Sequence, residues 1–196
     1  AHADATSPIH RGVFLARSIL GRGLRPPPEA VTPASPDLHP GLLTRERVAL
    51  QTEAQACQSC HSLINPLGFT LEHFDAAGRI RDKEYGKPVD ASGSYLLPNG
   101  DTVTFADARD LAEFLVDHDE THRAFAVQLH HYLVKQPVTA YGADMPQKLT
   151  QTFARNDLRI QDITLEIATQ AALAKIAPTE KSEVLARLGN IAQPQN

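Results

Sequence analysis

The chain has no tryptophan, one methionine and only two cysteines in 196 residues. Two cysteines cannot build a disulfide framework, so the fold must depend on a hydrophobic core, which a chain of this length can form. No apolar run approaches the roughly 20 residues that a membrane-spanning helix needs. An excess of basic residues is also missing, since the net charge is −4. This charge argues against a nucleic-acid-binding protein.

Helix signals are present along most of the chain. Ser7 and Pro8 are typical of a helix start, with a hydroxyl cap before a proline, and Gly21 ends that pattern. Further helices are expected to begin at Thr44, Asp107, Thr121, Pro146, Asn156 or Asp157, and Thr179. The first residues contain neither an initiator methionine nor an apolar signal segment. We therefore expect the chain to be a mature or excised part of a longer protein.

Breaks between the helices are marked by proline and glycine. The Pro-rich segment 25–41 predicts an extended strap or a passive linker. Pro66 and Gly68 predict a break after the cysteine segment, with only a short helical turn over residues 69–74. Asn99 and Gly100 suit the turn of a small hairpin, which is the only clear strand signal. The sequence thus predicts a mainly α protein with one β-hairpin.

Both cysteines lie in the stretch "CQSCH", which spans residues 57–61. Cys57 and Cys60 would suit a redox dithiol, but no strand–helix–strand pattern surrounds them. A zinc site would need two more ligands, and no histidine pair stands at a suitable spacing. A structural disulfide across so short a loop would contribute little.

Covalent haem attachment accounts best for this pattern. One helical turn separates Cys57 from Cys60, so that both sulfur atoms can reach the two vinyl groups of one porphyrin edge. His61 follows directly and can bring its ring to the iron as the proximal ligand. A proximal histidine usually donates its other ring N–H to a carbonyl or carboxylate. The segment "NPLG" with Pro66 stands where cytochromes c provide that carbonyl, although Asn-Pro is also a common turn opener.

The sequence resembles the C-terminal half of the planctomycete-type cytochrome c proteins, which are large secreted bacterial chains with domains of unknown function. The matching positions are Thr6, Ser7, Pro8, Arg11, Gly12, the run Pro26 to Pro28, the attachment motif, Pro66, Gly68, Phe69, Leu71, Glu72, Phe74, Asp75, Gly78, Arg79, Arg81, Asp90, Gly93, Asn99 and Gly100. Two positions depart from the family pattern. Asn65 stands where the family usually has Asp, and Lys135 with Gln136 stands where it tends to have Gly-Arg.

This resemblance implies a cytochrome c-like haem domain over residues 1–105 and a helical C-terminal domain over 106–176. A short helix and tail would follow over 177–196. It also implies a bacterial protein of the periplasm or cell surface, whose partner is a redox protein or another domain of the parent chain. Arg79 and Arg81 would either pair with the haem propionates or remain ordinary surface arginines.

The sixth iron ligand separates the possible functions. Met145 is the only thioether in the chain, and the rival ligands are the histidines at positions 10, 73, 118, 122, 130 and 131. A sixth ligand favours one-electron transfer, which is the function that we predict, with a single covalent haem c. An open position would instead suit a haem oxidase or peroxidase-like enzyme. In a third interpretation the haem only stabilises the fold of a larger assembly.

Overall fold

A computed structural model describes residues 6–24 and 41–174 of the chain. The chain forms two compact units, residues 1–124 and 125–196. The domain boundary predicted at residue 105 falls within the first unit. The Pro-rich segment, apart from Gly41, and the helix predicted to begin at Thr179 lie outside the described residues.

The first unit begins with helix α1 (Pro8–Phe14), which continues as a π-helical segment η1 (Leu15–Ile19). The predicted start at Pro8 is confirmed, and Gly21 leaves the helix with a φ of 65°. Ser7, however, does not cap the helix through its side chain, because its hydroxyl bonds to His10 Nδ1 at 2.5 Å. Helix α2 (Thr44–Gln51) follows. Thr44 is its first residue rather than its cap, and the Thr44 hydroxyl donates to Glu84 Oε1 at 2.5 Å.

Helix α3 (Gln55–Phe69) runs through the position where a break was predicted. Pro66 lies inside the helix, where it removes the amide that would donate to the Ser62 carbonyl, and Ser62 is an exposed residue. Gly68 allows close packing on α1, since a Cβ atom added there would lie only 1.9 Å from the Pro8 carbonyl oxygen. Gly12 has the same role on α1, where a Cβ atom would lie 2.0 Å from the Ile64 carbonyl oxygen. The two helices therefore touch through their backbones.

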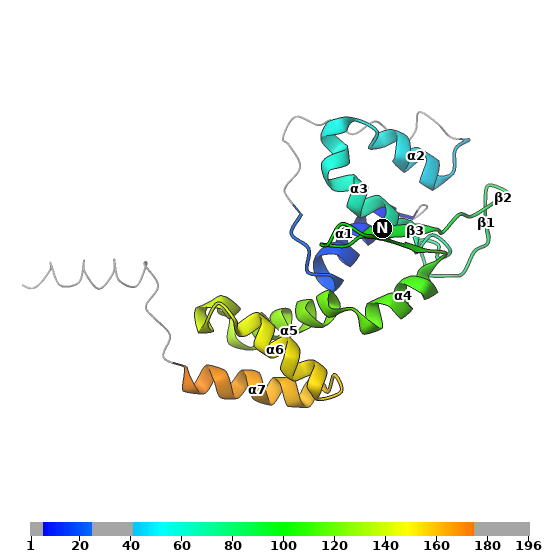
Figure 1. Cartoon of the computed structure of the whole chain (residues 1–196). Helices are drawn as coiled ribbons and strands as arrows, with labels where there is room; N and C mark the ends of the chain where they lie inside the picture. Colours follow the sequence, from blue (N-terminus) through cyan, green and yellow to red (C-terminus); the bar gives the residue numbers. More distant parts are fainter. Residues whose placement is uncertain (1–5, 25–40, 175–196) are drawn as a thin grey trace, which may run out of the picture. The chain divides into compact units, whose positions relative to one another are not determined.

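Two antiparallel hairpins follow α3, one more than the sequence predicted (Figure 1). The first pairs β1 (Lys83–Glu84) with β2 (Lys87–Pro88) through a turn in which Tyr85 and Gly86 have φ of 50° and 79°. Strands of two residues leave almost no periodic pattern, which explains why this hairpin was missed. The second pairs β3 (Gly93–Leu96) with β4 (Thr102–Phe105), and it confirms the turn predicted at Asn99 and Gly100.

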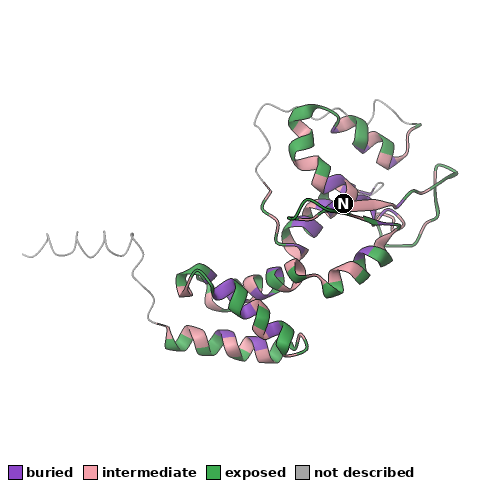
Figure 2. Cartoon of the chain, in the orientation of Figure 1, coloured by how far each residue is buried: buried purple, intermediate pink, exposed green. Residues whose placement is uncertain are grey.

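The core of the first unit is formed where η1, α3, β3, β4 and helix α4 (Ala108–Asp117) contribute buried side chains. Buried positions gather on the inward sides of these elements (Figure 2). The core side chains are Leu15, Ala16, Leu20, Leu67, Tyr95, Phe105 and Leu111. Asp107 caps α4 as predicted, because its side chain accepts hydrogen bonds from the backbone amides of Arg109 and Asp110. Helix α3, which carries both cysteines, thus contributes to the core of its own unit.

The second unit contains the C-terminal part of α5 (Asp119–Val134), a short 3-10 helix η3 (Val138–Tyr141), α6 (Met145–Arg155) and α7 (Ile160–Leu173). Its core is formed by Ala126, Val138, Met145, Leu149, Phe153, Ile163 and Ile167. The helix start predicted at Pro146 is confirmed. The start predicted at Asn156 or Asp157 is wrong, because α7 begins at Ile160, after left-handed backbone at Asp157 and Leu158. Ile160 is exposed, whereas Ile163 and Ile167 are buried.

The fold class is confirmed as mainly α with small hairpins. In the described part of the chain, no helix combines the length and the apolarity that crossing a membrane requires.

Candidate haem-attachment site

The two cysteines lie in the first turns of α3, one helical turn apart. Both thiols are free and half-buried. The start of the helix is anchored by the Ala54 carbonyl, which accepts from the Cys57 amide at 2.8 Å and from the Gln58 amide at 3.1 Å. Gln58 Nε2 donates to the Thr52 carbonyl at 2.5 Å and ties α3 to the end of α2. Two thiols three residues apart on a helix share one face, as the attachment hypothesis requires.

His61 is half-buried on the same helix, directly after Cys60. Its Nδ1 lies 2.9 Å from Oδ1 of Asn65, one turn further along α3. Asn65 is only 7% exposed, and its Nδ2 donates to Oγ1 of Thr52 at 2.8 Å. The Thr52 hydroxyl in turn donates to the Val48 carbonyl at 2.8 Å. These four residues form a continuous hydrogen-bonded chain from α2 to the imidazole.

The partner of His61 is therefore a side chain, not a carbonyl of the segment around Pro66 as the sequence predicted. The prediction fails because residues 65–68 are helical, so their carbonyl groups point along the helix axis and not toward the His61 ring. The Pro66 carbonyl lies against β3, where a Cβ atom on Gly93 would approach it to 2.2 Å. The spacing of four residues between His61 and Asn65 was the available signal, but it is meaningful only if the helix continues past Pro66. A contact of Pro66 with a haem stays a prediction.

Arg79 and Arg81 are already paired with carboxylates. Arg79 Nε lies 2.7 Å from Asp75 Oδ2, and its side chain is 81% exposed. Arg81 contacts Glu72 Oε2 at 2.7 Å and Glu84 Oε1 at 3.4 Å. The propionate role of both arginines stays a prediction, and Arg81 would have to serve it in addition to these two ion pairs.

Glu72 is the centre of a buried polar cluster that the sequence reasoning did not single out. Its carboxylate is 2% exposed and accepts hydrogen bonds from Thr6 at 2.7 Å, Arg11 at 3.0 Å and Arg81 at 2.7 Å. Burial raises the pKa of the Glu72 carboxyl, while the Thr6 hydrogen bond and the charges of Arg11 and Arg81 oppose that shift. The cluster joins the start of α1 to the segment that follows α3, and so supports the attachment helix.

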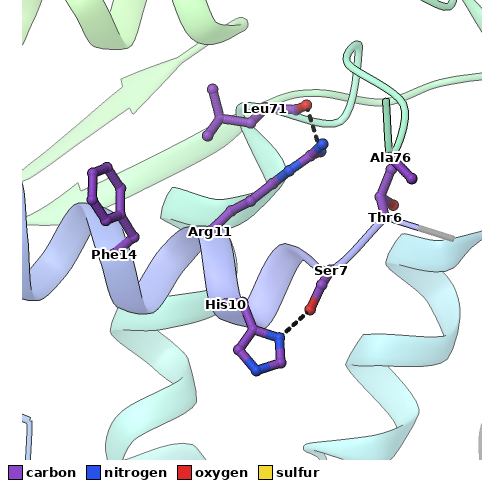
Figure 3. Close-up of a pocket in the computed structure, with 7 residues that line it drawn as sticks. All are labelled: Thr6, Ser7, His10, Arg11, Phe14, Leu71 and Ala76. Carbon is purple, nitrogen blue, oxygen red and sulfur yellow. Dashed lines mark hydrogen bonds between the residues drawn. The ribbon is translucent and has the colours of Figure 1, made fainter. Parts of the chain in front are cut away.

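A hollow of about 250 Å³ opens beside this cluster (Figure 3). Arg11 crosses it to donate to the Leu71 carbonyl at 2.8 Å, and Phe14 forms an apolar wall. His10 stands at its rim with its Nδ1 toward Ser7. The rival ligand His10 lines this hollow, whereas Cys57, Cys60, His61 and Met145 do not.

Met145 lies in the second unit, where it is the first residue of α6 and 7% exposed. Its side chain belongs to the apolar cluster of that unit, together with Val138, Leu149 and Phe153. Its role as sixth ligand stays a prediction.

The rival histidines each bond or contact protein groups near their own element. His73 Nδ1 lies 3.0 Å from the Arg81 carbonyl, and His118 Nε2 lies 3.2 Å from Glu120. His130 is 2% exposed, and its Nδ1 has no hydrogen-bond partner among residues 6–24 and 41–174. Burial lowers the pKa of His130, so the ring is neutral at pH 7. Within the same described ranges, no group of three or more His, Cys, Asp and Glu side chains is arranged to hold a metal ion.

Comparison with known proteins finds a family match. Residues 1–84 match the family model PSCyt3, described as a protein of unknown function (DUF1588). The match includes the attachment motif and is consistent with a planctomycete cytochrome-type domain family. No curated protein and no solved structure matches the chain.

Proposed function

We propose that this chain is a c-type cytochrome module that holds one haem through Cys57 and Cys60, with His61 as the proximal ligand. Its function is one-electron transfer in the bacterial periplasm or at the cell surface, as part of a larger protein. The partner is a redox protein or another domain of the parent chain. The observation that carries this proposal is a pair of free thiols one helical turn apart, followed directly by an imidazole whose Nδ1 is held by Asn65.

The thiols fit covalent attachment. Each thiol adds its sulfur and its hydrogen across one vinyl double bond, so nothing leaves and no oxidant is consumed. That addition needs reduced cysteines, and both are free in this structure. Half-burial leaves the sulfur atoms reachable while α3 holds them at a constant spacing. Two bonds to one rigid helix fix the porphyrin edge through a segment of only a few residues.

The imidazole also fits. With Nδ1 engaged by Asn65, the lone pair of Nε2 is the one available to the iron. No hydrogen bond of Nε2 is found in the described part of the chain. A haem bound in this way supplies an iron that accepts and releases single electrons. The chain's own residues hold the ring orientation, exclude water from the buried side of α3 and present the attached edge to a partner.

A second candidate function is a haem oxidase or peroxidase-like module with an open sixth position. It is favoured by the burial of Met145 in the apolar core of the second unit, which supports a packing role for the one thioether of the chain. Carbon monoxide separates the two candidates, because it binds at once to ferrous iron with an open position. Slow or absent binding supports electron transfer.

The attachment is tested in the full chain, matured in a host that attaches haem to c-type cytochromes. In pyridine under alkaline, reducing conditions, we expect the spectrum of a haem with both vinyl groups saturated. Cys57→Ser should yield a spectrum with one vinyl group retained. Ser59→Ala is the matched control, because Ser59 stands between the cysteines and is exposed, and it should behave as wild type. Equal spectra for Cys57→Ser and wild type would overturn the proposal.

A further inference from the structure

We infer that Asn65 is a positioning residue that fixes the tautomer of His61 and keeps the midpoint potential higher than a carboxylate would at the same position. This inference rests on the proposed function. It concerns the neutral hydrogen-bond chain between Val48 and His61, which lies on the side of the imidazole away from the iron ligand atom.

The direction of every hydrogen bond in the series from Val48 to His61 follows from the Val48 carbonyl, where the series begins. The Val48 carbonyl can only accept, so the single hydroxyl proton of Thr52 points toward it at 2.8 Å. Thr52 Oγ1 is then left to accept, and only the NH₂ group of Asn65 can donate to it, at 2.8 Å. The amide oxygen of Asn65 must therefore face His61.

An amide oxygen is purely an acceptor, so Nδ1 of His61 must carry the ring proton across the 2.9 Å contact. In a neutral imidazole this leaves Nε2 deprotonated, which is the form that binds a metal. A flipped Asn65 amide would present NH₂ to Nδ1 and move the proton to Nε2, where it would block ligation. Thr52 opposes the flip, because its oxygen needs a donor from Asn65.

Burial makes the arrangement rigid. Asn65 is 7% exposed and Thr52 is 4% exposed, so water cannot easily replace either partner. Asn65 also lies on the same helix as Cys57, Cys60 and His61, so thiols, imidazole and acceptor keep one geometry. The side-chain amide of Gln58 donates to the Thr52 carbonyl and so helps to hold Thr52 in place.

The charge of the acceptor determines how strongly the imidazole donates to iron. A carboxylate accepts the Nδ1 proton more strongly than an amide does, raises the basicity of Nε2 and stabilises ferric iron. The amide of Asn65 gives a weaker version of the same effect. Removing the hydrogen-bond acceptor of Nδ1 altogether weakens electron donation from Nε2 to the iron and destabilises ferric iron.

The test measures midpoint potentials of the haem-loaded full chain. Asn65→Asp should lower the potential, by about tenfold in the ferric-to-ferrous ratio, or about 59 mV for one electron. Asn65→Leu, similar in size and without an acceptor, should raise it. Opposite shifts identify positioning through the imidazole, because loosened packing or added hydration would move both variants the same way. Shifts of equal sign, or none, overturn the inference.

A second pair of variants leaves Asn65 and His61 in place. Thr52→Val removes the acceptor that orients the Asn65 amide, and it should raise the potential. Thr70→Val is the matched control, because Thr70 ends α3 as Thr52 ends α2. Thr70 is buried like Thr52 and donates to the Leu67 carbonyl at 2.6 Å without bonding to Asn65. This control should alter stability only. Equal effects of the two variants on the potential contradict the inference, even if Asn65→Asp fails to fold.

The failure of this inference differs from the failure of the proposed function. If wild-type protein carries no haem after maturation, the proposed function is wrong and the inference falls with it. If wild type carries haem and the potentials do not respond as stated, the inference alone is wrong.

Discussion

The backbone contact between α1 and α3 at Gly68 gives a prediction whose size follows from the structure. Replacing Gly68 by alanine places a Cβ atom 1.9 Å from the Pro8 carbonyl oxygen and 2.7 Å from its carbon. Ordinary contact begins at 3.4 Å, so the two backbones must separate by roughly 1.5 Å. The obstacle is backbone, so no side-chain rotation relieves it.

The expected cost combines two opposing effects. Overpacking costs about 1–3 kcal/mol, and a backbone clash belongs at or above the upper end of that range. Alanine regains about 1 kcal/mol over glycine in a helix. We therefore expect Gly68→Ala to lower the free energy of unfolding by about 2 kcal/mol. In a unit of this size that corresponds to a decrease in Tm of roughly 6–12 °C.

The assay is urea and thermal unfolding followed by circular dichroism. Gly23→Ala is the control, because a Cβ atom there meets no atom within 4 Å, and its effect should stay within about 0.5 kcal/mol. If Gly68→Ala is as stable as Gly23→Ala, the two helices do not touch through their backbones at this point.

Two further predictions concern Met145 and Asp75. Met145→Leu keeps the apolar volume of the second core, so the free energy of unfolding should fall by less than about 1.5 kcal/mol. The visible spectrum of the haem-loaded variant tests the predicted ligand role: a changed spectrum with retained stability identifies Met145 as the sixth ligand, and an unchanged spectrum excludes it. Asp75 accepts hydrogen bonds from the Arg79 and Ala77 amides, and these lower the pKa of its carboxyl below 3.8. Because that pKa is lowered on folding, the stabilisation is present above pH 3.8 and lost as pH falls through the folded-state value. Asp75→Asn should accordingly be less stable than wild type in urea at neutral pH, and the difference should shrink as the pH falls below 3.8. A difference that stays constant with pH would show that the ionised carboxylate is not the stabilising form.

Much of the helical architecture could be predicted because its signals are local. Pro8 and Pro146 open helices where their missing N–H is not needed, and Asp107 caps α4 through its own side chain. The turn at Asn99 and Gly100 likewise reflects backbone preference within a few residues.

The errors arise where packing overrides local preference. Pro66 and Gly68 read as breakers, yet α3 continues because Gly68 lets α1 pack against it. The delayed start of α7 depends on left-handed backbone at Asp157 and Leu158, and local preference does not predict this conformation for a leucine.

The sequence suggested the candidate ligands, but it did not indicate the residues that hold His61 in place. The pattern "CQSCH" is a local signature of haem attachment, so Cys57, Cys60 and His61 could be proposed from their spacing alone. The acceptor for His61 could not, because Asn65 is oriented by Thr52, thirteen residues earlier in the sequence. Such a contact exists only once α2 and α3 are folded together.

The central claim is the covalent link between this chain and one haem. The most direct test is intact-protein mass spectrometry of the wild-type chain matured in a host competent for c-type cytochromes, under denaturing conditions that remove any non-covalent group. We predict the mass of the polypeptide plus one haem. The mass of the bare polypeptide, from a host that loads a control cytochrome c, would contradict the account.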